Sequence, residues 1–394
     1  MKWPATRLES QAGKSFGMFE TAARLQAQGA DIIHLEVGRP SADTPRHIKE
    51  AAKTALDNGI VHYGELNGLG PLREALAHRF SETQGVHFDA DEVLITNGVT
   101  QASFAAFMAA LDEGDEVIVL EPFYPQHNSK IAFAGGRVVS VPMAQHDGRF
   151  SPDPARIEAA ITERTRMLVL INPSNPCGTL FTREELQAVA DVVEKHDLLV
   201  LSDEVYEFIA FDGHQHTSFA ALPGMRDRTI TVNAFTKAYA MDGWRIGYAI
   251  APRNFIADLQ RVTMNETTHP CVFAQEGALA AVTGSQDCVT DMVREDRERR
   301  DVVVARFNAI PGCHCATPEG TIYAFPNISG LGASSSEVAM YLLESAHVAV
   351  ESGAFYGDTG EGHLRVCFGS EPMPRIEEAM SRIEQALTGG NTPW

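Results

Sequence analysis

Seven short apolar runs, rich in β-branched residues, recur through the middle of the chain, and helical patterns separate several of them. Runs of this kind favour strands that are buried on both faces. Strands that alternate with helices favour a parallel sheet with helices on both sides. We therefore predict an α/β fold with a seven-stranded, mostly parallel sheet. The predicted strands are residues 92–96, 116–122, 137–142, 166–171, 198–202, 229–233 and 245–250.

Two of the predicted helices between these strands carry clear start signals. Asp153 can cap a helix whose first turn contains Pro154. Thr182 and Glu185 have the spacing of a capping box, in which each side chain bonds a free backbone N–H group of the other residue.

The two ends of the chain have a different pattern. After the predicted sheet come a long charged helix, two strand-like stretches and two further helices, at residues 285–310, 313–317, 321–326, 335–346 and 372–387. A chain of 394 residues is long for one hydrophobic core, since cores usually stop growing near about 250 to 300 residues. We predict a large domain at 46–284 and a smaller α+β domain formed by residues 1–45 and 285–394.

The charge of the chain argues against two classes of partner. A net charge of -20 would repel the phosphate backbone of a nucleic acid, and it also disfavours acidic membranes. No apolar run reaches the roughly 18 to 20 residues of a membrane span, and the start of the sequence lacks the apolar core of a signal peptide. We expect a cytoplasmic protein.

The six cysteines have neither the paired spacing of a zinc site nor the density of a disulfide scaffold. Cys313 and Cys315 flank His314, so a metal site is one interpretation of this triplet. The alternation of a strand explains the triplet as well. No metal site is predicted.

Polar segments follow four of the predicted strands directly. In open parallel sheets, ligands collect at the carboxyl edge, where such segments meet. The four segments are NGVTQ (97–101), NPSNPCGT (172–179), DEVY (203–206) and AFTK (234–237).

Each segment has an ordinary interpretation beside a functional one. NGVTQ can bind an anion at a helix N-terminus, or its asparagine or threonine can simply cap that helix. Asp203 can meet a protonated ring nitrogen, or cap a helix over residues 204–210. Lys237 can be a nucleophile or a solvated lysine. Arg245, inside an apolar strand start, is expected to pair with phosphate or carboxylate.

The combination decides between these interpretations. Pyridoxal 5′-phosphate needs an anion cradle, a donor to its phenolic oxygen, an acid for its ring nitrogen and a lysine for its aldehyde. The sequence offers all of these in order, so we predict that the chain binds this cofactor.

These segments resemble those of the class I and II aminotransferases, most closely the bacterial branch of the aspartate aminotransferase fold. NPSNPCGT is similar to the family's NPxNPTG, DEVY to DE[IV]Y, and KAYAMDGWRIGY to KxxAMTGWRxGY. HYGELNGLGPLREAL and GHLRVCF match further family segments, and the likeness covers about residues 30–385. The resemblance implies fold type I of the pyridoxal-phosphate-dependent transferases, with a large cofactor-binding domain and a small domain that closes over the substrate.

The resemblance also implies a role for each matching residue around the cofactor. Lys237 would hold the cofactor as an internal aldimine and move the proton between the substrate Cα and C4′. Asp203 would pair with the pyridine nitrogen, and Tyr124 would stack on the ring. The other cofactor-binding residues would be Asn175 and Tyr206 at the phenolic oxygen, and Val99, Thr100, Thr236 and Arg245 at the phosphate.

Substrate and subunit contacts follow from the same resemblance. Arg365 would bind the substrate α-carboxylate, with Gly38 and Asn175 beside it. Tyr63 would reach the phosphate of the neighbouring subunit, which implies a homodimer with shared active sites.

The implied activity is transfer of an amino group from an L-amino acid to a 2-oxo acid by a ping-pong mechanism. Two alternatives stay open. The same fold and cofactor could catalyse β-elimination, as in a C–S lyase, or oxidative deamination. A non-catalytic sensor domain of a regulator is the other, although the intact Lys237 and Asp203 speak against it, as does the lack of a DNA-binding segment before residue 30.

Several positions depart from the family pattern. Ala234 stands where a phosphate-binding serine is common, and Thr236 could compensate. Thr100 replaces a lysine that reads a distal carboxylate in aspartate-using relatives. Arg39 could take over that task, but we favour a surface arginine, and we interpret His34 as a packing residue. The donor pocket would involve Arg39, Tyr63, Phe16 and residues 265–273, a set that suits aromatic, aliphatic or acidic side chains.

Overall fold

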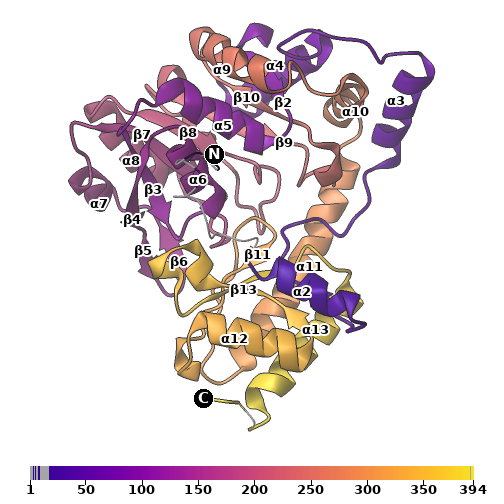
Figure 1. Cartoon of the computed structure of the whole chain (residues 1–394), viewed down its shortest axis with the longest axis vertical. Helices are drawn as coiled ribbons and strands as arrows, with labels where there is room; N and C mark the ends of the chain where they lie inside the picture. Colours follow the sequence, from indigo (N-terminus) through magenta and orange to yellow (C-terminus); the bar gives the residue numbers. More distant parts are fainter. Residues whose placement is uncertain (1–2, 4, 6–7, 9–16, 391) are drawn as a thin grey trace.

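The computed structural model of the chain describes residues 3, 5, 8, 17–390 and 392–394. Figure 1 shows a sheet surrounded by helices in its upper part and segments from both chain ends in its lower part. The two ends meet through a short parallel pair, β1 (Ile33–His34) with β12 (Val348–Ala349), in which Ile33 lies opposite Val348. Phe16 lies outside the described residues.

The central sheet has seven strands in the order β2-β10-β9-β8-β7-β3-β4. Only β10 runs antiparallel to its neighbours, so the prediction of a seven-stranded, mostly parallel sheet is confirmed. The strands are β2 (Val93–Thr96), β3 (Glu116–Glu121), β4 (Arg137–Pro142), β7 (Thr165–Ile171), β8 (Leu199–Asp203), β9 (Thr229–Ala234) and β10 (Gly247–Ile250).

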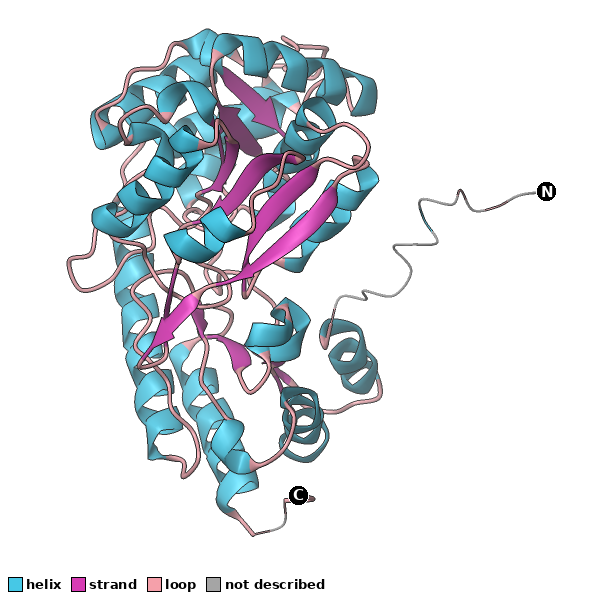
Figure 2. Cartoon of the chain, turned by 90° about the vertical axis from the view of Figure 1, so that its left-hand side faces the viewer, coloured by secondary structure: helices cyan, strands magenta, loops and turns pink. Residues whose placement is uncertain are grey.

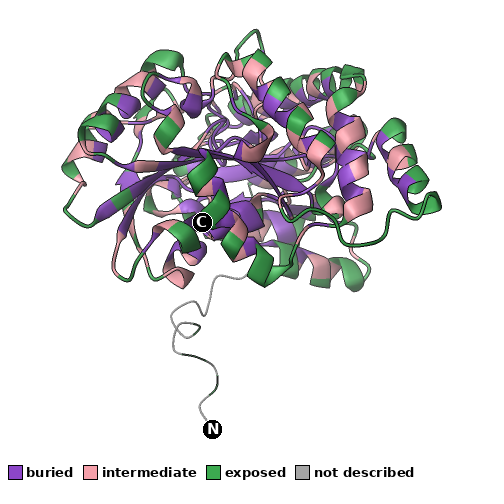
Figure 3. Cartoon of the chain, turned by 90° about the horizontal axis from the view of Figure 1, so that it is seen from above, coloured by how far each residue is buried: buried purple, intermediate pink, exposed green. Residues whose placement is uncertain are grey.

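Helices cover both faces of this sheet, as Figures 2 and 3 show. The covering leaves β2, β3 and β9 buried throughout, while in the edge strand β4 only Val141 is buried. The helices of this part are α3 (Arg46–Asp57), α4 (Gly70–Gln84), α5 (Val99–Ala110), α6 (Pro125–Phe133), α7 (Pro154–Ala159), α8 (Arg183–Lys195), α9 (Arg253–Glu266) and α10 (Val272–Thr283).

Both predicted helix starts are confirmed. The Asp153 carboxylate accepts hydrogen bonds from the backbone N–H groups of Ala155 and Arg156, at 3.1 and 3.2 Å. At α8 the Thr182 hydroxyl accepts from Glu185 N at 3.1 Å, and the Glu185 carboxylate accepts from Thr182 N at 2.8 Å. Local side-chain chemistry therefore sets where these helices begin.

Segments from both chain ends share one hydrophobic core. It includes Ala22 and Ile33 near the start, and Phe307, Leu342 and Ile383 near the end. Its elements are α2 (Phe19–Ala27), α11 (Asp287–Ala309), α12 (Ser335–Tyr341), α13 (Met373–Thr388), β11 (Tyr323–Ala324), β13 (Glu351–Ser352) and β14 (Leu364–Cys367). The predicted domain boundaries themselves stay a prediction.

The strands predicted near the C-terminal end are wrong in extent. Residues 313–317 form no strand, and His314 makes only an isolated bridge to Asn327. The stretch 321–326 contains a strand of two residues, β11. The helix predicted at 335–346 changes to a π-helical turn at Leu342–Ala346. Short pieces of this kind are held by tertiary contacts, which hydrophobic alternation does not report.

One hairpin was missed. Strands β5 (Ala144–His146) and β6 (Arg149–Ser151) pair antiparallel around Asp147 and Gly148, both with positive φ, at 48° and 83°. An Asp-Gly pair is a strong sequence signal for such a turn. No helix of the described residues has the length and apolar character that a membrane span needs.

Candidate active site

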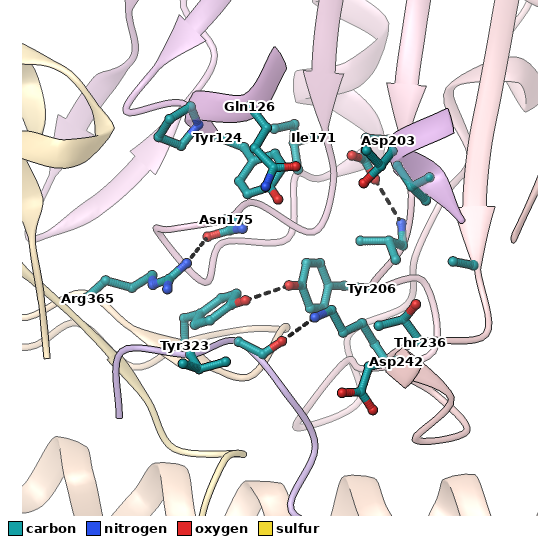
Figure 4. Close-up of a pocket in the computed structure, with 18 of the residues that line it drawn as sticks. Tyr124, Gln126, Ile171, Asn175, Asp203, Tyr206, Thr236, Asp242, Tyr323 and Arg365 are labelled. Carbon is teal, nitrogen blue, oxygen red and sulfur yellow. Dashed lines mark hydrogen bonds between the residues drawn. The ribbon is translucent and has the colours of Figure 1, made fainter. Parts of the chain in front are cut away.

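A cavity of about 610 Å³ opens at the carboxyl edge of the sheet, where β7, β8 and β9 end. Figure 4 shows side chains from the sheet edge and from the C-terminal segments pointing into it. Every predicted site residue except Tyr63 lines this cavity: Gly38, Val99, Thr100, Tyr124, Asn175, Asp203, Tyr206, Thr236, Lys237, Arg245 and Arg365.

The N-terminus of α5 faces the cavity without a capping side chain. Gly98 precedes the helix with φ 86°, a conformation that suits glycine. Because no side chain caps this end, the alternative that Asn97 or Thr100 merely caps the helix is wrong. Uncapped N–H groups at a helix N-terminus, together with the helix dipole, are suited to bind an anion.

Arg245 lies beside this helix N-terminus, but its backbone does not have the predicted strand conformation. The expectation of a guanidinium inside a strand start is wrong, because β10 begins at Gly247 and Arg245 is exposed. Its backbone is left-handed, with φ 52°, after a 3₁₀ turn at Asp242–Trp244. A Cβ at Gly98 would stand 2.8 Å from Arg245 Nη2, so the glycine leaves room for the guanidinium.

Asp203 ends β8 with its carboxylate in the cavity. Its Oδ2 lies 3.1 Å from His127 Nε2, and its Oδ1 accepts a hydrogen bond from Val205 N at 3.3 Å. The alternative of a helix capped by Asp203 is wrong, since residues 205–208 form a turn. His127 was missed in the sequence, although it lies in the first turn of α6, three residues after Tyr124, which directly precedes the helix.

The Lys237 amine donates a hydrogen bond to the backbone carbonyl of Gly38. The pKa of Lys237 is lowered to about 8, because burial and the charge of Arg365 outweigh the opposing effects of Cys367, Asp242 and Asp203. A lysine with this pKa has a sizeable neutral fraction near neutral pH, as a nucleophile or base requires. The interpretation of Lys237 as a solvated lysine is therefore wrong.

Two hydrogen bonds join the sheet edge to the C-terminal segments across the cavity (Figure 4). The hydroxyls of Tyr206 and Tyr323 are 2.8 Å apart, and Arg365 Nη1 donates to Asn175 Oδ1 at 3.2 Å. Burial raises the pKa of Tyr206 well above its usual value, so its hydroxyl keeps its proton. Tyr323 was missed because it lies 117 residues from Tyr206.

Arg365 is buried and lines the same cavity. Its guanidinium lies 4.4 Å from the Tyr323 ring centroid and 5.0 Å from that of Tyr356. Among the described residues its Nε has no hydrogen-bond partner. A buried guanidinium with a free N–H group suits a carboxylate, which can accept two parallel hydrogen bonds.

The chain matches the family model for aminotransferases of class I and II over residues 30–383. It belongs to this family. It is 38% identical to aromatic-amino-acid aminotransferase 2 of Thermococcus litoralis, over 92% of this chain and 93% of that protein. It is 37% identical to the aspartate aminotransferase of Pyrococcus abyssi, over 94% of each. A solved aspartate aminotransferase from Rhizobium meliloti superposes with a TM-score of 0.93 at 34% identity, covering 98% of this chain and 99% of that one.

The predicted family, fold type, enzyme class and cofactor are thereby confirmed: the chain is a pyridoxal-phosphate-dependent aminotransferase. The cavity of this aminotransferase fits the cofactor. It offers an uncapped helix N-terminus for a phosphate, a carboxylate for a ring nitrogen and an amine whose pKa is lowered. These are the partners that pyridoxal 5′-phosphate requires.

Some predicted pocket residues lie elsewhere. Tyr63 is 90% exposed and does not line the described cavity. The exposed Arg39 and residues 265–273 do not line it either. His34 bonds Glu36 at 2.8 Å and Gln26 at 3.2 Å, as expected of a packing residue. Ala234 does line the cavity, so the departure from serine there concerns the site directly.

One cluster of metal-ligand types occurs among the described residues, formed by Glu204, Glu207 and His216. It does not line the cavity. Ser218 donates to Glu204 at 2.9 Å, and Tyr248 donates to Glu207 at 3.3 Å. Because hydroxyl donors already engage both carboxylates, we assign no metal to this cluster.

Proposed function

We propose that this aminotransferase moves an amino group from an L-amino acid to a 2-oxo acid in a ping-pong reaction carried by Lys237, Asp203 and Arg365. One observation supports these assignments above all. The amine, the carboxylate and the guanidinium come from segments far apart in the sequence and converge on one cavity at the sheet edge. An α-amino acid has a carboxylate and a Cα proton for two of these groups to act on.

The other lining residues supply the cofactor contacts in this proposal. The backbone N–H groups of Val99 and Thr100, with Arg245 and the Thr236 hydroxyl, bind the phosphate. Tyr124 stacks on the ring, and its own ring contacts His127, the residue that bonds Asp203. When bound, pyridoxal 5′-phosphate supplies the electron sink that stabilises negative charge at the substrate Cα.

The chain's own groups then handle the substrate. Arg365 binds the α-carboxylate, next to Asn175 and the backbone of Gly38, and this contact aims the Cα–H bond at Lys237. The Lys237 amine acts as a positioned base and moves that proton between the substrate Cα and C4′ of the cofactor. Tyr206 and Asn175 hold the phenolic oxygen of the cofactor, with Tyr323 fixing the Tyr206 hydroxyl at 2.8 Å.

Single half-reactions followed by absorbance test the reaction class. Addition of an amino donor alone should convert the pyridoxal form of the enzyme to the pyridoxamine form, and 2-oxoglutarate alone should reverse the change. Release of ammonia and a 2-oxo acid without the pyridoxamine form would instead show β-elimination. Consumption of oxygen with the donor would show oxidative deamination. Either result would contradict the proposed transamination.

The amino donor is identified by the same assay. Relatives include aromatic-amino-acid and aspartate aminotransferases, and the cavity is lined by the rings of Phe19, Tyr124, Phe355 and Tyr356. Thr100 offers no cation for a distal carboxylate, and Arg39 lies outside the described lining. A panel of aromatic, aliphatic and acidic amino acids, each paired with pyruvate and 2-oxoglutarate, decides among the three donor classes.

The proposal includes a homodimer with shared active sites. Tyr63 lies within an exposed apolar segment that also contains Leu56, Ile60, Val61 and Leu66. Exposed apolar side chains gathered in this way are typical of a surface that another molecule covers. Covering by a second copy would bring Tyr63 to the phosphate of the neighbouring cavity.

Hybrid dimers test this sharing. Tyr63→Ala alone should weaken binding of pyridoxal 5′-phosphate about tenfold, by loss of a hydrogen bond to a charged group. A dimer of one Tyr63→Ala chain and one Lys237→Ala chain should contain one site with wild-type affinity, because the Lys237 site then receives an intact Tyr63 from its partner. Weakened affinity at that site would show that Tyr63 acts within its own chain.

Two further parts of the proposal concern organisation. We assign residues 46–284 to a cofactor-binding domain, and residues 1–45 and 285–394 to a domain that closes over the substrate. The core shared by both chain ends supports this division. A cytoplasmic location stays a prediction from the sequence.

A further inference from the structure

A second buried amine lies in the cavity, on Lys130 of α6. The residue is only 8% exposed, and its single recorded hydrogen bond runs from Nζ to Ser103 Oγ of α5, at 2.8 Å. Among the described residues no carboxylate stands within ion-pair distance of this amine. A buried cation without a paired anion is costly, so its position in the cavity calls for an explanation. The cofactor and substrate contacts proposed above do not use it.

Lys130 and His127 lie on one face of α6, because they are three residues apart in the helix. His127 is fully buried, and its Nε2 lies 3.1 Å from Asp203 Oδ2. Its Nδ1 has no hydrogen-bond partner among the described residues. A neutral imidazole in this place therefore carries its proton on Nε2 and donates it to Asp203.

The charged groups that act on His127 come from two elements. Asp203 of β8 favours the imidazolium form, whereas burial and the charge of Lys130 on α6 favour the neutral form, and the net effect lowers the pKa of His127. The rings of Tyr124 and Phe107 contact the imidazole edge-on, at 5.5 and 5.9 Å between centroids, and bring no charge. Burial lowers the pKa of Lys130 to about 8, and attraction to Asp203 opposes this. The amine is thus mostly charged at neutral pH.

We propose that Lys130 is a positioning residue whose charge keeps the His127 imidazole neutral, so that its Nε2–H group donates to Asp203. The hydrogen bond to Ser103 holds the amine between α6 and α5, in the cavity that Asp203 also lines. Because a neutral imidazole brings no positive charge to Asp203, the charge of this carboxylate stays available to a cationic group in the cavity. The consequence for catalysis rests on the proposed role of Asp203 toward the cofactor, but the protonation state of His127 does not.

Magnetic resonance of histidine labelled with ¹³C tests the proposal in the holoenzyme, with His127→Gln used to assign the signal. In the wild type His127 should stay neutral from pH 8 down to a pH below the ordinary pKa of histidine. In Lys130→Met, loss of the cation should raise the pKa of His127 by about one unit. Lys130→Gln removes the same charge but can still bond Ser103, so it should show the same rise even if the methionine variant folds poorly.

Three further variants separate charge from packing. Lys130→Arg keeps the charge and should restore a low pKa of His127, and Ser103→Ala keeps the charge and should change it little. Lys53→Met removes an exposed lysine of α3 and should leave His127 unaffected. An unchanged His127 titration in both neutral Lys130 variants would overturn the proposal. So would a rise in Ser103→Ala as large as that in Lys130→Met. None of these readouts requires turnover, so they stand apart from a failure of the proposed transamination.

Discussion

Replacement of Lys237 by alanine should lower kcat by more than about a thousandfold, because one side chain carries two tasks. It supplies the amine that binds the cofactor aldehyde, and it moves the substrate proton. The absorbance of the bound pyridoxal form should also disappear, since the variant has no amine at this place in the cavity. Lys53→Met, which changes an exposed lysine, is the matched control and should retain wild-type kcat. A kcat of Lys237→Ala within tenfold of the wild-type value would contradict the assigned mechanism.

The Lys237 amine also predicts a pH dependence. Its pKa in the cofactor-free chain is lowered to about 8, so the neutral, reactive form dominates above that pH. Below pH 8 the neutral fraction falls about tenfold for each pH unit. The rate at which cofactor-free enzyme regains its absorbance with pyridoxal 5′-phosphate should fall by the same factor. A rate that already begins to fall near pH 10 would show that burial leaves the pKa of this amine unchanged.

Replacement of Asp203 by asparagine should lower kcat by about a hundredfold to a thousandfold. The amide has the shape of the carboxylate but cannot hold a proton on the ring nitrogen, so the electron sink is weakened. KM for the donor should change much less, because Arg365 and not Asp203 is assigned to bind the substrate carboxylate. This split between kcat and KM is measured in steady-state assays with saturating cofactor.

Two controls complete the Asp203 measurement. Asp203→Glu keeps the charge and should recover part of the lost kcat. His127→Gln keeps a donor to the carboxylate, so its kcat should fall less than that of Asp203→Asn. Wild-type kcat in Asp203→Asn would remove Asp203 from the mechanism, and a large rise in KM with unchanged kcat would assign it to substrate binding instead.

Much of the fold was predictable because it depends on local patterns. Buried strands need continuous apolar runs, so the seven strands of the sheet stood out in the sequence. Asp153 and Thr182 mark their helix starts through bonds to residues two and three positions away. The Asp147-Gly148 hairpin was equally readable and was overlooked. The two-residue strands near the C-terminal end were not readable, since long-range pairing alone holds them.

The candidate site divides in the same way. Polar segments at strand ends brought out Lys237, Asp203 and Asn175, because strand ends meet at one edge of a parallel sheet. The roles of Tyr206 and Arg365 came from the resemblance to the family. The sequence offered no signal for Tyr323, whose hydroxyl meets Tyr206 from a segment 117 residues away. Arg245 was assigned to the right cavity, but it was predicted in a strand start and lies in a left-handed turn before β10.

By itself, the sequence determined the α/β class, the family and the cofactor, because strand periodicity, capping residues and short motifs act over a few neighbouring positions. Only the tertiary structure decided the charges of the groups in the cavity. Lys237, Lys130 and His127 are ordinary titratable residues in the sequence. In the structure burial lowers the pKa of each, against the opposing charge of Asp203 at the end of β8. Desolvation and long-range charge act through space, so they are settled only when distant segments pack together.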